Sequence, residues 1–480
     1  MRRMPGLLIL VSTLAIATGP ARAAGKQQIS SDPFTNADSQ HATQVEPDTF
    51  AFGSTVVSAF QSGRFFDGGS SDIGFATSLD GGTTWTHGFL PSITVNSTPT
   101  GPYARVSDPA VAYDARHDTW MIASLGIDSF GDGLGVLVSR SKDGGLTWSA
   151  PVTVATTNVF YDKTWIVCDN TAASAHYGNC YATWDDAGQG DLLLASTSSD
   201  GGKTWGAPKP SKDQNFGLGG QPLVQPAGVV VVPYLSAVVN EIQAYRSKNG
   251  GKGWTATTTV SSFNDHGVAG GLRTEPLPSA EIDANGKVYV VWQDCRFRTN
   301  CSSNDIVMST SSNGKSWSSP VRIPIDPVSS TVDHFIPGLA VDRTSSGNTA
   351  RLALTYYFYP VANCSVSTCQ LSVGFVSSTD GGASWTAPIT LAGPMALGDL
   401  ANTSQGSMVG DYISTSFAGA NAVSVFALAK PKQGTVFDES MYSTTQAVSA
   451  LDSHPLRVTD DPVLSTQSDR PRRTQVLTTP

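Results

Sequence analysis

Seven short segments of the chain combine residues that could do acid/base chemistry. Four of them set an acid or an amide directly before proline: Glu46-Pro47, Asp108-Pro109, Gln221-Pro222 and Glu275-Pro276. The other three are Tyr161-Asp162-Lys163, Asp333-His334 and Gly410-Asp411-Tyr412. Carboxyl groups can cleave a glycosidic bond as acid, base or nucleophile. These segments therefore supply the groups that such a reaction needs.

Arginines accompany several of these segments. Arg105 and Arg273 precede the acids Asp108 and Glu275 by three and two residues, and Arg64 and Arg296 lie in two similar loops, 61–65 and 293–297. A guanidinium group binds a carboxylate through two parallel hydrogen bonds. Gathered around one cavity with the carboxyl groups, the arginines suit the recognition of an acidic sugar.

Residues so far apart in sequence need a repeating architecture to bring them together. One octet recurs, first as Ser-Leu-Asp-Gly-Gly-Thr-Thr-Trp over 78–85. Further copies span 141–148, 198–205 and 378–385, a weaker copy spans 247–254, and a copy one residue shorter spans 311–317. The octet predicts a tight hairpin: the Asp accepts turn N–H groups, the glycines supply positive φ, and the Trp covers the turn.

The spacing of the octets predicts four strands per repeat. Their tryptophans recur every 49 to 68 residues, which suits one four-stranded sheet plus loops. Around the 311–317 copy, the expected strands are 276–282, 287–294, 305–311 and 319–325, so the octet joins a third strand to a fourth.

The end of the chain offers three further strands without an octet, at 411–417, 422–429 and 439–446. Their missing outer partner could be the segment 27–31, which would close a ring of seven sheets and remove open sheet edges. A ring of six sheets is the alternative.

The octet resembles the Asp-box of sialidases and related β-propellers. The resemblance implies an all-β fold over residues 24–450, a β-propeller of four-stranded antiparallel blades with the Asp-boxes on the face opposite the site. It also implies roles: Asp108 as acid/base, Tyr412 as nucleophile and Glu275 as the proton acceptor of Tyr412. The acceptor is needed because a free tyrosine has a pKa of about 10.

The same resemblance implies a set of substrate-binding residues. Arg296 is expected to clamp the substrate carboxylate, and Arg64, Arg105 and Arg273 compete for the other clamp positions. Glu46, Asp411 and His334 complete the groups expected to face the substrate.

Two features depart from the sialidase pattern. Sialidases carry Arg-Ile-Pro near the start of the catalytic domain, whereas Arg322-Ile323-Pro324 occurs late and directly after a box tryptophan, so we interpret it as a coincidence. The sixth repeat begins with His334 where an arginine is expected. These departures leave the third clamp and the identity of the sugar open. His334 and Tyr412 also have purely structural interpretations, as a hydrogen-bonded residue and as the start of a strand.

The N-terminus predicts export. Arg2 and Arg3 precede the apolar stretch 7–17, and Ala21-Arg22-Ala23 suits signal peptidase, so residues 1–23 are typical of a secretory signal peptide. In an oxidising compartment the six cysteines predict three local disulfides, Cys168/Cys180, Cys295/Cys301 and Cys364/Cys369. The polar tail, 451–480, is predicted to be disordered.

Composition excludes several classes of partner. With 30 Lys+Arg against 39 Asp+Glu, the net charge of −9 argues against nucleic acid as a partner. No stretch after the signal peptide is apolar enough to insert in a membrane. We expect a secreted monomer with no cofactor. The many loop carboxylates are compatible with a structural Ca²⁺, but they follow no defined ligand spacing.

These features lead to one expected function and two alternatives. The expected protein is a secreted glycoside hydrolase that resembles exo-α-sialidases and cleaves terminal acidic sugars from a glycan or glycoconjugate with retention. The first alternative is a non-catalytic propeller that binds a glycan or a protein, because Asp-boxes do no chemistry themselves. The second is a hydrolase or lyase of another uronate-containing polysaccharide.

Overall fold

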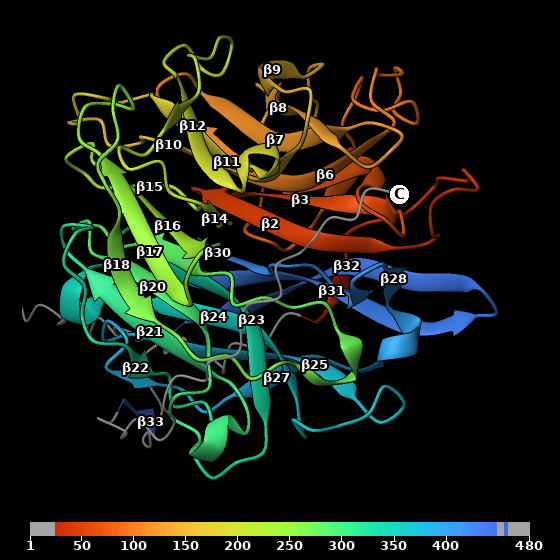
Figure 1. Cartoon of the computed structure of the whole chain (residues 1–480), viewed down its shortest axis with the longest axis vertical. Helices are drawn as coiled ribbons and strands as arrows, with labels where there is room; N and C mark the ends of the chain where they lie inside the picture. The colour runs from red at the N-terminus through yellow and green to blue at the C-terminus, as the bar shows by residue number, and fades with distance from the viewer. Residues whose placement is uncertain (1–24, 449–455, 459–480) are drawn as a thin grey trace, which may run out of the picture.

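The computed structural model describes residues 25–448 and 456–458. Antiparallel sheets follow one another around the molecule in chain order, as the colours of Figure 1 show. The helical elements of the described residues are short 3₁₀ turns: η1 (Ala187–Gln189), η2 (Ala269–Gly271), η3 (Thr299–Cys301), η4 (Gly347–Thr349) and η5 (Leu397–Asp399). The prediction of an all-β chain built from four-stranded antiparallel sheets is confirmed.

The first two repeats share one eight-stranded sheet, joined where Ser70 of β4 pairs with Val106 of β6. Its first half contains β2 (Gln44–Phe52), β3 (Thr55–Arg64), β4 (Ser70–Ser78) and β5 (Thr86–Phe89). Its second half contains β6 (Arg105–Asp114), β7 (Thr119–Ile127), β8 (Gly133–Ser141) and β9 (Val152–Thr156).

Four separate sheets continue the series. The third repeat contains β10 (Tyr161–Cys168), β11 (Cys180–Asp186), β12 (Leu192–Ser198) and β13 (Lys209–Pro210). The fourth contains β14 (Gly217–Leu218), β15 (Leu223–Val224), β16 (Val230–Ser236), β17 (Glu241–Ser247) and β18 (Thr258–Ser262). The fifth contains β19 (Ser279–Ile282), β20 (Val288–Asp294), β21 (Asp305–Ser311) and β22 (Val321–Arg322). The sixth contains β23 (Asp333–Val341), β24 (Leu352–Tyr359), β25 (Gln370–Ser378) and β27 (Ile389–Ala396).

The last sheet joins the two ends of the described chain. It contains β30 (Ser414–Ala418), β31 (Asn421–Gln433), β32 (Val436–Ala447) and, as its outer strand, β1 (Gln27–Gln28). Gln27 lies opposite Ser443, and the Ile29 N–H donates to Met441 O at 2.9 Å. The predicted pairing of segment 27–31 with the last sheet is confirmed. Strand β2 also contacts β30, so the first repeat lies against the last.

Proline explains where the fifth-repeat strands differ from their predicted bounds. Strand β19 begins at Ser279 rather than 276, and β22 is limited to Val321–Arg322. Pro276 and Pro278 precede the first strand, and Pro320 and Pro324 flank the second. Because proline has no N–H to donate to a neighbouring strand, ladder pairing stops beside it.

The octets form the predicted turns. In the first, Asp80 Oδ1 accepts the Thr84 N–H at 2.8 Å and Ser78 Oγ accepts the Gly82 N–H at 2.8 Å. The Trp85 indole donates to Gly82 O at 3.2 Å, which places the ring over the turn. Each box also packs on the preceding sheet: Thr77 Oγ1 donates to Gly145 O at 2.7 Å, and Arg140 Nε donates to Gly201 O at 2.6 Å.

The first box closes this series on the last sheet. A Cβ added at Gly82, whose φ is +87°, would lie 3.0 Å from Val423 in β31 and 2.9 Å from Thr445 in β32. The box glycine therefore allows the first repeat to pack closely against the seventh.

All six cysteines pair as predicted, in Cys168–Cys180, Cys295–Cys301 and Cys364–Cys369. Two short strand pairs lie outside the repeats, β28 (Ala401–Thr403) with β29 (Gly406–Met408), and β26 (Ser384–Trp385) with β33 (Leu456–Arg457). The latter corrects the prediction of a wholly disordered tail, because Arg457 pairs with Ser384 of the last box. The predicted signal peptide, 1–23, and tail residues 451–455 and 459–480 lie outside the described residues.

Candidate active site

Two of the acid-before-proline segments, Glu46-Pro47 and Asp108-Pro109, form β-bulges in the first strands of their sheets, whereas Glu275-Pro276 precedes β19. The pairing register shifts between Val45 and Asp48 in β2 and between Ser107 and Ala110 in β6. At these bulges Glu46 has a φ of +56° and Asp108 a φ of +48°. A bulge redirects a side chain and tolerates a proline that cannot donate to the ladder. Left-handed backbone at a non-glycine residue also costs free energy, and such strain concentrates at functional sites.

The bulge recurs in β10 and β23 with different residues. Lys163 and Ile336 each have a φ of +48°, at register shifts between Asp162 and Trp165 and between Phe335 and Pro337. Lys163 thus occupies in β10 the position that Asp108 occupies in β6. No role was predicted for Lys163, although Tyr161-Asp162-Lys163 is one of the seven segments with residues that could do acid/base chemistry.

A buried ion cluster joins residues from distant repeats. Arg273 makes two hydrogen bonds to Asp411, from Nε to Oδ1 at 2.8 Å and from Nη2 to Oδ2 at 2.5 Å. Lys163 Nζ contacts the same Asp411 carboxylate and lies 3.5 Å from Asp108 Oδ1. The cluster therefore joins four parts of the chain: the bulges in β6 and β10, the segment before β19 and the segment before β30.

Glu46 and Gln61 extend the cluster into the first repeat. The Asp411 N–H donates to Glu46 Oε1 at 3.2 Å, and the Gln61 amide donates to Glu46 Oε2. Gln61 Oε1 in turn accepts from Arg64 Nη1 at 3.3 Å. The predicted residues Glu46, Arg64, Asp108, Arg273 and Asp411 are thus brought into one neighbourhood.

The cluster splits the pKa values of two neighbouring carboxyl groups. Burial, reinforced by the charges of Asp108 and Asp411, raises the pKa of Glu46 to about 7. Burial also raises the pKa of Asp411, but Arg273 and Lys163 outweigh it and hold that pKa below its ordinary value. Near neutral pH, Asp411 is ionised while Glu46 exchanges a proton. When two neighbouring carboxyl groups have separated pKa values, the group with the higher pKa can act as an acid while the other stays ionised.

Asp108 stands where the cluster meets a cavity. Asp108, Lys163, Asp411 and Tyr412 line this cavity, which extends along the first strands to Phe50. Ser107 Oγ donates to Asp108 Oδ2 at 2.6 Å, whereas Oδ1 accepts no hydrogen bond within the protein. Asp108 is 5% exposed, and its Oδ1 is held by the charge of Lys163, 3.5 Å away, and not by a hydrogen bond.

Tyr412 borders the same cavity, but its hydroxyl is engaged. It donates to Pro109 O at 3.2 Å, and the ring meets Trp165 edge to face with centroids 5.1 Å apart. Burial, with the charges of Glu46 and Asp108, raises the pKa of Tyr412 well above its usual range. This environment does not activate the phenol. Glu275, predicted as its proton acceptor, is partly buried two residues after Arg273.

The remaining predicted arginines are bound by other protein groups. Arg105 Nη1 lies 2.6 Å from Asp67 Oδ1, and its guanidinium lies over the Phe65 ring, 4.3 Å from the centroid. Arg296 donates to Asp294 Oδ2 from Nε at 2.8 Å and from Nη2 at 2.6 Å. Arg64 is buried, donates to Gly69 O at 2.7 Å and has an unpaired Nε. Burial lowers the pKa of Arg64 to about 10.

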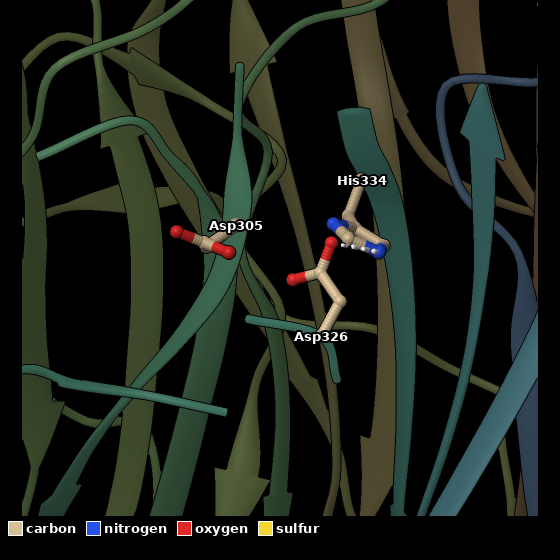
Figure 2. A group of neighbouring side chains, drawn as sticks. All are labelled: Asp305, Asp326 and His334. Carbon is tan, nitrogen blue, oxygen red and sulfur yellow. Dashed lines mark ion pairs between the residues drawn. The ribbon is translucent and has the colours of Figure 1, made fainter. Parts of the chain in front are cut away.

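His334 lies in a second ion cluster, which is the one group of potential metal ligands found among the described residues. Ligand atoms of Asp305, Asp326 and His334 lie within 4.8 Å of one another, and Figure 2 shows the Asp326 carboxylate directed at the His334 ring. Arg298 bridges the two aspartates, contacting Asp305 Oδ1 at 2.5 Å and Asp326 Oδ1 at 2.6 Å.

Arg322 reinforces that bridge, with Nε 2.9 Å from Asp305 Oδ1 and Nη2 2.7 Å from Asp326 Oδ1. Two guanidinium groups thus balance the two carboxylates, so this donor set does not suit a divalent cation. Burial lowers the pKa of His334. The structure gives the Arg322-Ile323-Pro324 segment a role in this ion network on β22.

Comparison with known proteins finds a family that is similar to part of the chain. Residues 133–352 match the family described as BNR repeat-like domain. The match covers just under half of the chain, and the resemblance to sialidase-like Asp-box proteins is confirmed. Among curated proteins, none matches this chain significantly.

Several solved structures are similar to this chain. A protein of unknown function from Dyadobacter fermentans is 13% identical, with 89% of this chain and 99% of that chain covered at a TM-score of 0.46. A Hadza microbial sialidase is 14% identical, with 85% and 66% covered at a TM-score of 0.43, so this chain spans about two thirds of the sialidase. A polysaccharide lyase, an ulvan lyase bound to a GlcA(1-4)Rha3S unit, is 12% identical, with 88% and 94% covered at a TM-score of 0.49.

The described residues contain no helix long and apolar enough to cross a membrane.

Proposed function

We propose that this protein is an exported enzyme that cleaves glycans carrying a carboxylate. The observation that carries the proposal is the position of Asp108, whose Oδ1 accepts no hydrogen bond beside the Lys163–Asp411–Arg273 cluster at the cavity. A carboxyl group that lines a cavity can transfer a proton to or from a bound sugar. The adjacent cations attract the carboxylate of the sugar.

The proposed architecture is a seven-bladed β-propeller. Each repeat contributes one blade, and the eight-stranded sheet counts as two blades because only Ser70 and Val106 join its halves. The contacts of β2 with both β6 and β30 support the ring, as does the outer strand β1 on β32. In this arrangement the first strands of the blades begin on one face and the Asp-boxes lie on the opposite face. A substrate therefore approaches the face where the first strands begin.

A retaining hydrolase that resembles exo-α-sialidases is the first candidate. Asp108 acts as acid/base. Arg273 and Lys163 bind the substrate carboxylate, which weakens the ion pairs of both cations with Asp411.

Tyr412 is the candidate nucleophile. Its hydrogen bond to Pro109 O must break and its proton must pass to an acceptor, for which Glu275 is the predicted group. Its oxygen can then attack the anomeric carbon and displace the leaving group, which Asp108 protonates.

A lyase of uronate-containing polysaccharides is the second candidate, and the environment of Tyr412 favours it. Proton abstraction beside a neutralised carboxylate needs a base and cations but no covalent nucleophile. Asp108 and the Lys163–Arg273 pair supply these groups while Tyr412 keeps its hydroxyl on Pro109.

A panel of sialosides, polygalacturonate and hyaluronan tests the proposal. Release of reducing sugar without ultraviolet absorbance indicates a hydrolase, and an absorbing unsaturated product indicates a lyase. Folded Asp108→Asn serves as the inactive control. Binding to one of these glycans without turnover would instead support a non-catalytic glycan-binding propeller.

The disulfides are compatible with an oxidising compartment, and export follows from the predicted signal peptide. Secretion can be checked by expressing the full chain and sequencing the N-terminus of the protein recovered from the medium. Cleavage after Ala23 is the expected result.

A further inference from the structure

Two exposed aromatic rings lie on neighbouring loops beside the candidate site. Phe66 is 52% exposed in the β3–β4 loop, and Phe130 is 77% exposed in the β7–β8 loop. These loops touch: a Cβ at Gly131 would lie 3.8 Å from Asp67 O and 3.9 Å from Arg105 Nη1. The rings therefore belong to one continuous part of the surface.

Arg105 holds both loops in place. Its Nη1 binds Asp67 and donates to Gly68 O at 3.1 Å, while its Nη2 donates to Ser129 O at 3.2 Å. The Phe130 loop is also closed on itself, because Asp128 Oδ1 accepts the N–H groups of Phe130 at 2.8 Å and of Asp132 at 3.0 Å. Because these hydrogen bonds fix both loops, the two exposed phenylalanines form a preorganised surface that suits contact with a ligand.

Both loops are connected along the chain to residues at or near the buried ion cluster. Phe66 follows Arg64 by two residues, and the charges of Glu46, Asp108 and Asp411 all act on the Arg64 guanidinium. Arg105 precedes Asp108 by three residues, a separation of about 10 Å along a strand. A chain bound at Asp108 can therefore continue over the two rings.

We propose that Phe66 and Phe130 form an aromatic platform that stacks against further sugar rings of a polymeric glycan. This inference rests on the proposed function and names its substrate class: an oligosaccharide or polysaccharide longer than one acidic sugar. Phe66 follows the buried Phe65 and precedes Asp67-Gly68-Gly69, and Phe130 lies within Asp128-Ser129-Phe130-Gly131-Asp132. An apolar ring surrounded by hydrogen-bonding groups matches a sugar, which presents C–H groups on its face and hydroxyls at its edge. A protein interface would place a wider apolar area there.

The charges near Phe130 refine the substrate. Asp128 and Asp132 lie two residues before and two residues after Phe130 in the same loop, whereas Asp67, which follows Phe66, is paired with Arg105. An anionic sugar over Phe130 would be repelled, so an uncharged sugar is expected at this position and the acidic sugar near Asp108.

Binding of oligosaccharides of increasing length tests the platform. The probes are hyaluronan oligosaccharides, in which acidic and uncharged sugars alternate, oligogalacturonates, sialyl oligosaccharides and the corresponding monosaccharides. Titration calorimetry with the longest ligand that binds should show about five- to tenfold weaker binding for Phe66→Ala and for Phe130→Ala, with monosaccharide binding unchanged. Phe130→Ala should weaken hyaluronan oligosaccharides more than oligogalacturonates.

Phe52→Ala is the matched control, because Phe52 is 45% exposed at the other end of β2. It should bind every probe like the unaltered chain. Equal binding of the longest ligand by Phe66→Ala, Phe130→Ala and the unaltered chain overturns the inference alone. So does an equal loss for monosaccharide and oligosaccharide, which would place the rings in the primary site. Sedimentation with phosphatidylcholine vesicles that depends on the two phenylalanines would assign the platform to a lipid surface. If the unaltered chain neither binds nor cleaves any acidic glycan, the proposed function fails and this inference fails with it.

Discussion

Arg273 and Asp411 form a bidentate ion pair across 138 residues of sequence, with Nε and Nη2 donating to separate carboxylate oxygens at 2.8 and 2.5 Å. Lys163 contacts the same carboxylate, so one buried anion lies between two cations. The pair connects the segment before β19 with the segment before β30, so the site also holds distant repeats together.

Asp411→Asn should therefore destabilise the protein strongly. The variant leaves Arg273 and Lys163 buried without their shared anion, and breaking a buried pair from one side costs about 3–5 kcal/mol. Urea unfolding should show a lower midpoint with an unchanged slope. Asp438→Asn is the control, because its pair with Lys430, at 3.7 Å, is about half exposed and should matter by less than about 1 kcal/mol. Equal losses of stability in the two variants would contradict the proposed contribution of the buried ion cluster to stability.

Asp72 should make stability fall as the pH rises. Burial raises the pKa of Asp72 from 3.8 to about 8, and its Oδ2 has no hydrogen-bond partner. The folded chain thus keeps the proton up to about pH 8, whereas the unfolded chain releases it near pH 4. The contribution is complete below pH 4 and is lost across this window, at up to about 1.4 kcal/mol per pH unit.

Asp72→Asn should remove that dependence, because the amide mimics the protonated acid. Between pH 5 and 7 the free energy of unfolding should fall less steeply with pH for Asp72→Asn than for the unaltered chain. Exposed Asp38→Asn should keep the original slope. Parallel curves for all three proteins would show that Asp72 ionises normally.

The first Asp-box should be important for packing the first repeat against the last sheet. Gly82→Ala combines a φ of +87° with contacts to Val423 and Thr445 in the last sheet, whereas Gly53→Ala has a φ of +63° and nothing within 4 Å. Both substitutions should cost backbone strain, and Gly82→Ala should cost about 1–3 kcal/mol more through overpacking. Thermal unfolding measures the difference. A Gly53→Ala variant as unstable as Gly82→Ala would refute the packing argument.

The cluster of Asp305, Asp326 and His334 should be independent of metal. Arg298 is fully buried and pairs with both aspartates, so chelation with EDTA should leave the melting temperature unchanged. Arg298→Gln should lower stability by about 3–5 kcal/mol, because it uncovers buried carboxylates. A melting temperature that falls on chelation and recovers with Ca²⁺ or Zn²⁺ would contradict this interpretation.

The elements that local sequence determines were predicted well. The Asp-box turn uses contacts within eight residues, so its copies give the third and fourth strands directly, and the cysteine pairs lie 5 to 12 residues apart. The outer strand β1 could also be predicted, because the last three strands otherwise lacked a partner. The exact ends of β19 and β22 depend on neighbouring prolines, which the prediction from the strand pattern did not take into account.

The pairing of the charged residues could not be read from the sequence. Arg296 was expected to face the substrate, but Asp294, two residues earlier, lies within reach of its guanidinium. Arg105 was expected to compete for a carboxylate-clamp position, yet its guanidinium lies over the Phe65 ring. Lys163 was not assigned because no proline follows it to mark the bulge. The equivalence of Lys163 with Asp108 in their repeats is the signal that could have revealed it.

Substitution of Asp108 and Tyr412 should separate the proposed reactions. Asp108→Asn removes the acid/base group in either candidate, so kcat/KM on the cleaved glycan should fall by about 100-fold or more. Tyr412→Phe removes only the hydroxyl that now donates to Pro109 O. A retaining hydrolase that attacks through this oxygen should lose about as much as Asp108→Asn, and a lyase should keep more than a tenth of its activity. Tyr113→Phe is the control, because its hydroxyl bonds Asp118 at 2.7 Å in the β6–β7 turn. Full activity of Asp108→Asn would refute both mechanisms, since each depends on a proton transfer at this carboxyl group.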